Sequence, residues 1–262
     1  EKIGGAQRMI QEGALADPQP KAIFGLHCFP QLALGTVGAL AGPALASTDT
    51  INITIKGRST HAAMPHKGID PIFVAAHTIT ALQGYVARMR PPFEPTLLTI
   101  GNLHAGTTHN IIPDTATMNG TLRAYSQEDR DAAKGAIRQI ATHTAAAFGA
   151  TAEVEIDEGY PVTFNNPDLT TYALNTARQA LGPDNATTNV ARGMGGEDFS
   201  YYAQKIPGCF IRLGTTPRDV TDPVTVHNSA FDFNDDALAT GITLLCALVW
   251  SWPGTTPTSD PA

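Results

Sequence analysis

The chain has 262 residues, a formal net charge of −7, and 42% hydrophobic against 16% charged residues. This composition is typical of a globular protein with room for one large or two modest domains. The acidic balance, without any cluster of lysine and arginine, argues against nucleic acid as a partner.

The cysteines and the apolar runs limit the cellular setting. Cys28, Cys209 and Cys246 lie far apart, form no CxxC pair and are odd in number, so they favour a reducing compartment and a cytoplasmic protein. The longest apolar run, 237–252, is interrupted by polar residues and falls short of the roughly 18–20 residues of a membrane span. We therefore expect no membrane partner and interpret this run as a buried terminal helix.

The first segments predict a helix over 2–13 and a short apolar strand over 22–26 that ends at His27. The middle of the chain then alternates between strand and helix patterns. The expected elements are a strand over 51–56, a helix from the Asp70–Pro71 cap to Pro91, strands over 96–100 and 115–124, a helix from the Ser126 cap to Gly149, and a strand over 152–156. The order β-α-β-β-α-β predicts a ferredoxin-like domain over 49–158.

The flanks of this insertion have a different pattern. Beyond residue 158 we expect a helix over 169–181 after Asp168, a short helix over 197–205, a strand over 209–213 and a helix from Asp236. Strands that alternate with helices predict an α/β layer with a mostly parallel sheet. We assign 1–48 and 159–252 to this layer and 253–262 to a disordered tail. Ligand groups in such sheets collect at strand ends, where His27 is expected.

Five stretches in order resemble one family. They are GLHCFP (25–30), GRSTHAAMPH (57–66), HNIIPDTATMNGTLRAYS (109–126), GGEDFSYYAQKIPG (195–208) and HNSAFDFNDDAL (227–238). In this order and spacing the chain resembles the M20 metallopeptidase/amidohydrolase family, in the subgroup of hippurate hydrolases, N-acyl-amino-acid deacylases and indole-acetyl-amino-acid hydrolases. The resemblance implies a two-metal α/β catalytic domain interrupted by a ferredoxin-like lid. It also implies a homodimer formed through the lid and hydrolysis of N-acyl amino acid amides by metal-activated water.

The resemblance implies two divalent ions per site, and zinc, manganese or cobalt suits its ligands. His27 matches the family's Leu-His ligand, His227 its C-terminal ligand, and Glu1 the second residue of its Glu-Glu pair, also a ligand. From the residues alone, a hydrogen-bonded loop histidine is the favoured interpretation of His27, and a surface loop histidine is the alternative for His227. We expect the general base and about half of the ligands to lie in a first half-domain that is missing here. The alternative is therefore an incomplete fragment or subunit that acts as a dimerising or binding module, or as half of a split enzyme.

His61 and His66 both lie in the predicted inserted domain. His61 could be a metal ligand, a substrate clamp or a polar loop residue, but its place in a separate domain from His27 argues against a metal role. By resemblance, His61 steadies the carbonyl oxygen as negative charge develops there, often in the partner subunit's site. We interpret His66 as structural.

Substrate contacts are expected from Asn110, Arg123 and Glu197. An N-acyl amino acid carries a free carboxylate, to which Asn110 can donate and which Arg123 can bind bidentately, although exposure alone would explain Arg123. The family places the stretch around Glu197 beside the substrate pocket, with Asp198 as a helix cap. The alternative is that both acids serve the helix start. Asp232 and Asp235 are expected to cap the last helix, with a carboxylate partner for His227 as the alternative.

Overall fold

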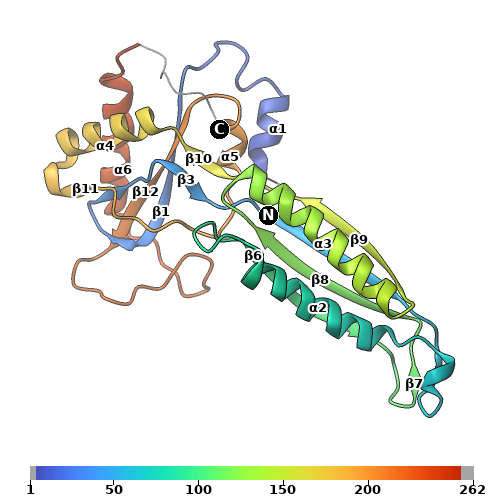
Figure 1. Cartoon of the computed structure of the whole chain (residues 1–262). Helices are drawn as coiled ribbons and strands as arrows, with labels where there is room; N and C mark the ends of the chain where they lie inside the picture. The colour runs from blue at the N-terminus through green and yellow to red at the C-terminus, as the bar shows by residue number, and fades with distance from the viewer. Residues whose placement is uncertain (1–3, 255–262) are drawn as a thin grey trace. The chain divides into compact units, whose positions relative to one another are not determined.

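The computed structural model describes residues 4–254, and the chain forms two compact units there (Figure 1). Glu1, an expected metal ligand, and residues 255–262 of the expected tail lie outside the described residues. The inserted unit comprises Ala46–Val162 and Met194–Gly196, and the flanking unit comprises Thr163–Gly193 and the described parts of Ile3–Leu45 and Glu197–Ala262.

The inserted unit is an antiparallel sheet with strand order β6-β8-β4-β9 and two helices, α2 and α3, on one face (Figure 1). The expected β-α-β-β-α-β order is confirmed. In chain order its elements are β4 Asp49–Lys56, α2 Pro71–Arg88, β6 Leu97–Ala105, β8 Thr115–Arg123, α3 Gln127–Ala147 and β9 Thr151–Glu158.

Local sequence sets the ends of these elements. The Asp70 carboxylate accepts a hydrogen bond of 2.9 Å from the Ile72 N–H, and Pro71 occupies the first turn of α2. The Ser126 hydroxyl likewise caps α3 by accepting from the Asp129 N–H at 3.0 Å. Gly149 follows α3 with a φ of +76°, the left-handed conformation that ends many helices. These three signals were correctly predicted.

One face of the sheet packs under α2 and α3, and the opposite face is polar. Ile51, Ile53 and Ile55 of β4 point into the apolar core with side chains that are at most 1% exposed. On the polar face, Asn119 donates to Asn52 at 2.6 Å, and Asn52 donates to Asp157 at 3.2 Å. This chain of hydrogen bonds crosses three strands and suits a sheet with one face in water.

Two short strands extend the inserted unit beyond the Lys56 end of β4. β5, Thr60–His61, pairs with β7, Ile111–Ile112, as an antiparallel ribbon. A single 3-10 turn, η1, Pro65–Lys67, follows β5. Sequence patterns did not predict this ribbon, because two-residue strands carry no periodicity.

The flanking unit has a four-stranded sheet of order β1-β12-β2-β11, with a parallel β1–β12 pair. The helices α4 and α6 contribute to its apolar core. Its elements are α1 Gly5–Gln11, β1 Ile23–Ala33, β2 Val37–Gly38, β3 Gly42–Leu45, β10 Thr163–Asn165, α4 Pro167–Leu181, η2 Pro183–Asn185, β11 Ala186–Thr187, α5 Phe199–Ala203, β12 Gly208–Thr216 and α6 Ala237–Trp250. A separate pair, β3 with β10, is antiparallel.

Three sequence-based expectations for this unit were wrong. β1 does not end at His27 but continues to Ala33, because backbone pairing with the long buried strand β12 carries on past the polar histidine. α4 is capped by Asn166, whose side chain accepts from two N–H groups, so Asp168 lies inside the helix. α6 has Asp236 at its N-cap position, in place of Asp232 or Asp235.

The turn before α6 is held by an amide and not by either expected carboxylate. The Asn234 side chain accepts from the Asp236 N–H at 3.0 Å. α6 itself has 14 residues, and no helix within residues 4–254 is long and apolar enough to span a membrane.

Candidate functional site

The β5–β7 ribbon brings His61 and Asn110 together from distant parts of the sequence. His61 lies opposite Ile111, and the Ala62 N–H donates to the Asn110 carbonyl oxygen at 3.0 Å. Both side chains are exposed. The Thr108 hydroxyl donates to the Asn110 side-chain oxygen at 3.0 Å, which turns the amide NH₂ group, a donor, away from that contact.

The backbone also selects the tautomer of His61. The Ala63 N–H donates to His61 Nδ1 at 3.1 Å, so Nδ1 is an acceptor. In a neutral imidazole the other nitrogen then carries the proton. His61 therefore presents an Nε2–H donor, the group that an oxyanion requires.

Arg123 lies at the opposite end of the inserted sheet. The pairing of β4 with β8 runs from Lys56 opposite Thr115 to Asp49 opposite Leu122, next to Arg123. At about 3.3 Å per residue, this separates Arg123 from the β5 end by more than about 20 Å. One inserted unit thus groups His61 with Asn110 but not with Arg123.

Arg123 lines a cavity of about 470 Å³ on the inserted unit. Its walls mix hydroxyl and acidic side chains with this one arginine. The lining residues are Thr48, Asp49, Thr50, Thr121, Arg123, Asp157, Glu158 and Gly159. The cavity offers one cation and several hydrogen-bonding groups to a polar ligand.

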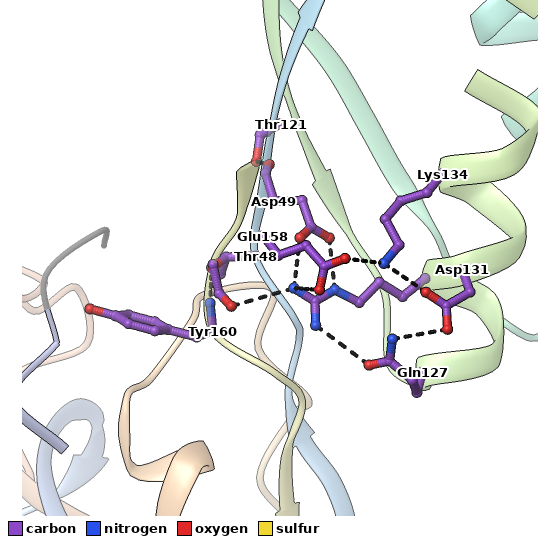
Figure 2. A network of polar contacts seen from close by, with 10 residues as sticks. Thr48, Asp49, Thr121, Gln127, Asp131, Lys134, Glu158 and Tyr160 are labelled. Carbon is purple, nitrogen blue, oxygen red and sulfur yellow. Dashed lines mark hydrogen bonds and ion pairs between the residues drawn. The ribbon is translucent and has the colours of Figure 1, made fainter. Parts of the chain in front are cut away.

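A buried ion pair lies beside this cavity and was not predicted from the sequence. Arg130 of α3 donates to both Asp49 carboxylate oxygens, at 2.9 and 2.6 Å, and both side chains are less than 5% exposed. Its guanidinium also reaches the Gly159 carbonyl at 3.4 Å and lies 3.9 Å from Glu158, which Figure 2 labels together with Asp49 and Lys134. Lys134 donates to Glu158 at 2.7 Å, and this bond lowers the pKa of the Glu158 carboxyl.

This network ties together the two ends of the inserted segment. Asp49 begins β4 shortly after the chain enters the unit, and Gly159 follows β9 shortly before the chain leaves it. Thr48 and Tyr160 continue the pairing, because the Thr48 N–H donates to the Tyr160 carbonyl at 2.9 Å. One feature of the sequence indicated this network: Arg130 lies on the same helix face as the buried residues Ala133 and Ile137 of α3.

In the flanking unit, the backbone fixes the opposite tautomer on His27. Its Nδ1 lies 2.7 Å from the Cys28 carbonyl oxygen, which can only accept. Nδ1 therefore carries the proton, and Nε2 keeps a free electron pair, as a metal-ligating histidine requires. The ring lies 5.9 Å from that of Phe210, so one wall of its surroundings is apolar.

Glu197 lies near His27 at the start of α5. Burial raises the pKa of the Glu197 carboxyl, and the hydrogen bond from the Phe199 N–H and the nearby His27 imidazole act in the opposite direction. Asp198 occupies the N-cap position of α5, but its side chain makes no cap bond. Its carboxylate instead accepts from the Ala6 N–H at 2.9 Å and holds α1, which corrects the expected capping role.

Arg212 is a second charged group that sequence patterns missed. It pairs in register with His27, is 3% exposed, and its guanidinium carbon lies 4.5 Å from the centre of the Phe29 ring. It donates to the Ala191 carbonyl at 2.6 Å and the Ala44 carbonyl at 3.4 Å. Arg212 thereby fixes the segment that leads to the glycine-rich stretch before Glu197. An arginine within the apolar run of β12 was the available signal.

His227 is exposed and has a φ of +66°, the only positive φ of a non-glycine residue within residues 4–254. Such a backbone is uncommon for residues other than glycine, although histidine adopts it more readily than most, and it is found at many functional sites. The segment around it folds against Pro30 and the end of β12 to enclose a cavity of about 540 Å³, which Asp232 and Asp235 also line.

The candidate ligands do not yet make a metal site. Within residues 4–254 no group of three or more histidine, cysteine, aspartate or glutamate side chains is placed to hold a metal ion. His27 and His227 are of a residue type that binds divalent ions. The described residues, however, bring too few such ligands together to hold one. All three cysteines are free, and Cys209 is buried.

Curated relatives align with nearly the whole chain. The chain is 36% identical over 241 residues to N-acetylcysteine deacetylase of Bacillus subtilis. This alignment covers 91% of this chain and 60% of that protein. It is 35% identical to IAA-amino acid hydrolase ILR1-like 4 of Arabidopsis thaliana, covering 92% and 55%. It is 33% identical to thermostable carboxypeptidase 2 of Saccharolobus solfataricus, covering 91% and 60%. The chain thus spans about 60% of the length of such relatives.

Solved structures and a family profile agree with these relatives. A dinuclear metal-binding peptidase of the M20 family from Bacillus subtilis superposes with a TM-score of 0.73 and 32% identity, over 93% of this chain and 61% of that one. A protein described as an aminohydrolase from methicillin-resistant Staphylococcus aureus gives a TM-score of 0.87 and 25% identity, over 95% and 63%. The profile of peptidase family M20/M25/M40 matches residues 1–251. The chain therefore belongs to this family.

Proposed function

We propose that this chain is a metal-dependent amidohydrolase that cleaves the amide bond of N-acyl amino acids. Relatives whose names specify an N-acetylated or indole-acetylated amino acid support this substrate class. In this proposal, 49–158 is the lid domain, and 1–48 with 159–252 belongs to the catalytic domain.

The observation that carries the proposal is the pair of opposite histidine tautomers. His27 offers a lone pair and His61 offers a hydrogen. Metal-dependent amide hydrolysis uses both kinds of group, since the metal needs an electron-pair donor and the tetrahedral oxyanion needs a hydrogen-bond donor. Each tautomer is set by a backbone atom, so each group is prepared before the substrate arrives.

The metal ligands proposed within this chain are His27, His227 and Glu1. A divalent ion held by them and by further donors would supply a Lewis acid and an activated water. The chain's own contribution is to fix the His27 ring and to bury the Glu197 carboxyl beside it. Zinc, manganese and cobalt all suit such ligands.

Substrate contacts are proposed for Asn110, Glu197 and Arg123. The Asn110 amide lies beside His61 and can donate to a substrate oxygen. Glu197 lies on the His27 side, where a half-buried carboxyl can accept from the substrate's amide nitrogen. Arg123 is proposed to bind a carboxylate in the cavity that it lines.

Two further proposals concern assembly and location. A homodimer formed through the lid is supported by the exposure of His61 at the end of the inserted unit farthest from Asp49 and Gly159. A cytoplasmic location is supported by the three free cysteines.

A second candidate function is a binding module or one half of a split enzyme. The absence of a three-donor group among residues 4–254, in a chain that spans about 60% of its relatives' length, favours it.

Metal analysis of the purified chain, together with an assay on N-acetyl-L-cysteine, separates the two candidates. If the chain is a complete hydrolase, we expect stoichiometric metal and turnover, whereas a chain with neither is the second candidate. Where turnover is found, His61→Ala should lower kcat by about 100-fold or more at unchanged metal content. His27→Ala should lose metal, and His143→Ala, on the exposed surface of α3, should change neither. Loss of metal in His61→Ala would instead make His61 a ligand.

A further inference from the structure

Arg212 is a charged residue within a strand that is buried along its whole length. β12 has the sequence GCFIRLGTT, and Arg212 is 3% exposed. A buried cation costs free energy unless its N–H groups find acceptors, whereas an aliphatic side chain at this position would carry no such cost. The contacts that Arg212 makes therefore indicate what it contributes.

The Arg212 guanidinium joins three segments of the flanking unit. It donates to the Ala191 carbonyl at 2.6 Å and to the Ala44 carbonyl at 3.4 Å, and it lies 4.5 Å from the centre of the Phe29 ring. Phe29 lies two residues after His27, which pairs in register with Arg212. Because alternate residues of a strand share a face, Phe29 and His27 lie on one face of the β1–β12 pair.

The segment that Arg212 holds is bound a second time at the same carbonyl. The Gly193 N–H donates to the Ala44 carbonyl at 3.0 Å, and Gly193 forms a parallel bridge with Leu45. A Cβ atom at Gly193 would lie 2.6 Å from Leu45 Cδ2 and 3.8 Å from Arg212 Nη2, so the backbone packs closely here. Residues 191–193 are thus fixed both to the end of β3 and to β12.

The 191–199 segment, which carries Glu197, has its second anchor at Phe199. The Phe199 ring lies 5.7 Å from the ring of Phe210 in β12. Phe210 and Arg212 are alternate residues of that strand, so the two anchors occupy neighbouring positions on one of its faces. One strand thus holds both ends of the segment that presents Glu197.

We propose that Arg212 is a positioning residue that fixes the place of the Glu197 carboxyl. Arg212 holds the start of the 191–199 segment and Phe199 holds its end, so few conformations remain for the residues between them. The bonds suit this role, because a charged guanidinium binds a carbonyl oxygen more strongly than a neutral donor does. The inference rests on the proposed function, in which Glu197 accepts a hydrogen bond from the substrate's amide nitrogen.

Amide hydrogen exchange of the full chain tests the positioning and needs no turnover. The Gly193 N–H reports on the start of the segment, and the Ser200 N–H, which donates to the Glu197 carbonyl at 3.2 Å, reports on its end. Arg212→Met removes the guanidinium donors but keeps a long side chain. In this variant we expect both amides to exchange at least about tenfold faster, because the segment opens locally, with the amides of α6 unchanged.

The amides of α6 separate a local effect from a general loss of stability. Equal acceleration of Gly193, Ser200 and α6 would mean that Arg212 serves the fold alone. Acceleration of Gly193 without Ser200 would mean that the anchor does not reach Glu197, and either result overturns the proposal. Arg178→Met, at an arginine that donates within α4, is the matched control and should leave all these amides unchanged. Where Arg212→Met does not fold, Arg212→Lys keeps a cation that can reach one carbonyl and should show the same pattern at smaller size.

Turnover of N-acetyl-L-cysteine then tests whether the positioning serves the reaction. Arg212→Met and Glu197→Ala should each raise KM by about tenfold or more with a smaller change in kcat, because the first displaces and the second removes a contact to bound substrate. If Arg212 acts through Glu197, the KM of the double variant should not exceed that of Glu197→Ala. A KM that multiplies the two single effects would overturn the proposal.

The exchange and turnover results distinguish this proposal from the proposed function. A wild type without turnover overturns the proposed function, whereas amide exchange still decides whether Arg212 positions Glu197. Faster exchange at both reporter amides with an unchanged KM in Arg212→Met overturns the role of Arg212 in substrate binding and leaves the proposed function standing.

Discussion

The inserted unit and the flanking unit differ in how fully their own residues cover the apolar surfaces of their strands and helices. In the inserted unit, both helices cover the apolar face of an antiparallel sheet, and the other face is polar. In the flanking unit, a parallel edge strand and an apolar helix flank have no partner within residues 4–254. The two units belong to one chain, yet only the inserted unit covers its apolar surface with its own residues. Each unit therefore completes its core separately.

The contrast extends to the buried arginines. Arg130 joins two strands and a helix of the inserted unit through a carboxylate. Arg212 of the flanking unit binds backbone carbonyls and a ring face. Arg130 thus links the two ends of the inserted segment, whereas Arg212 holds the segment that leads toward Glu197.

The largest expected effect breaks the closure of the inserted unit. Arg130→Met should lower the free energy of unfolding by about 3–5 kcal/mol, because it leaves the Asp49 carboxylate buried without its charge partner. Urea unfolding measures this. Arg138→Met on the exposed side of α3 is the control, with an expected loss below about 1 kcal/mol. Adding Asp49→Leu to Arg130→Met should restore much of the loss, and equal instability of the double variant would contradict this account.

A second experiment compares neighbouring leucines of α6. Leu244→Ala should cost about 2–5 kcal/mol, because its side chain is fully buried and leaves a cavity. Leu245→Ala, one residue further and 39% exposed, should cost about 0.5 kcal/mol in the chain alone. Thermal unfolding of the two variants gives the difference. Equal losses would mean that the flank of α6 that carries Leu245 is already covered.

The smallest effect is acid sensitivity in the inserted unit. The hydrogen bond from Lys134 lowers the pKa of the Glu158 carboxyl, so ionised Glu158 stabilises the fold above the ordinary glutamate pKa. This stabilisation is lost as pH falls through the lowered folded value. Lys134→Met should therefore reduce the stability difference between pH 7 and pH 3, by less than about 1 kcal/mol because Glu158 is more than half exposed. An unchanged pH dependence in urea unfolding would show that the bond contributes nothing.

The sequence predicted the inserted unit better than the flanking unit for a physical reason. The alternation of Ile51, Ile53 and Ile55 and the Asp70 and Ser126 caps act within a few residues, so local patterns locate its elements. The length of β1 depends on pairing with β12, which comes some 185 residues later in the chain, as His27 opposite Arg212 shows. No local pattern encodes that.

The candidate site was predicted in its residue types more than in its geometry. His61 and Asn110 were singled out separately, and only the β5–β7 ribbon shows that they adjoin. Arg130 and Arg212 were missed because a charged residue within an apolar pattern looks like an interruption until its partner is known. The roles of the proposed ligands and substrate contacts stay predictions.

The contacts that set the two histidine tautomers come from the main chain: an amide hydrogen at Ala63 and a carbonyl oxygen at Cys28. Nearly every amino acid offers the same two atoms. The sequence at positions 28 and 63 is therefore free to drift over generations without reversing the proton on either ring. Only proline at position 63 would delete the donor, since its nitrogen carries no hydrogen.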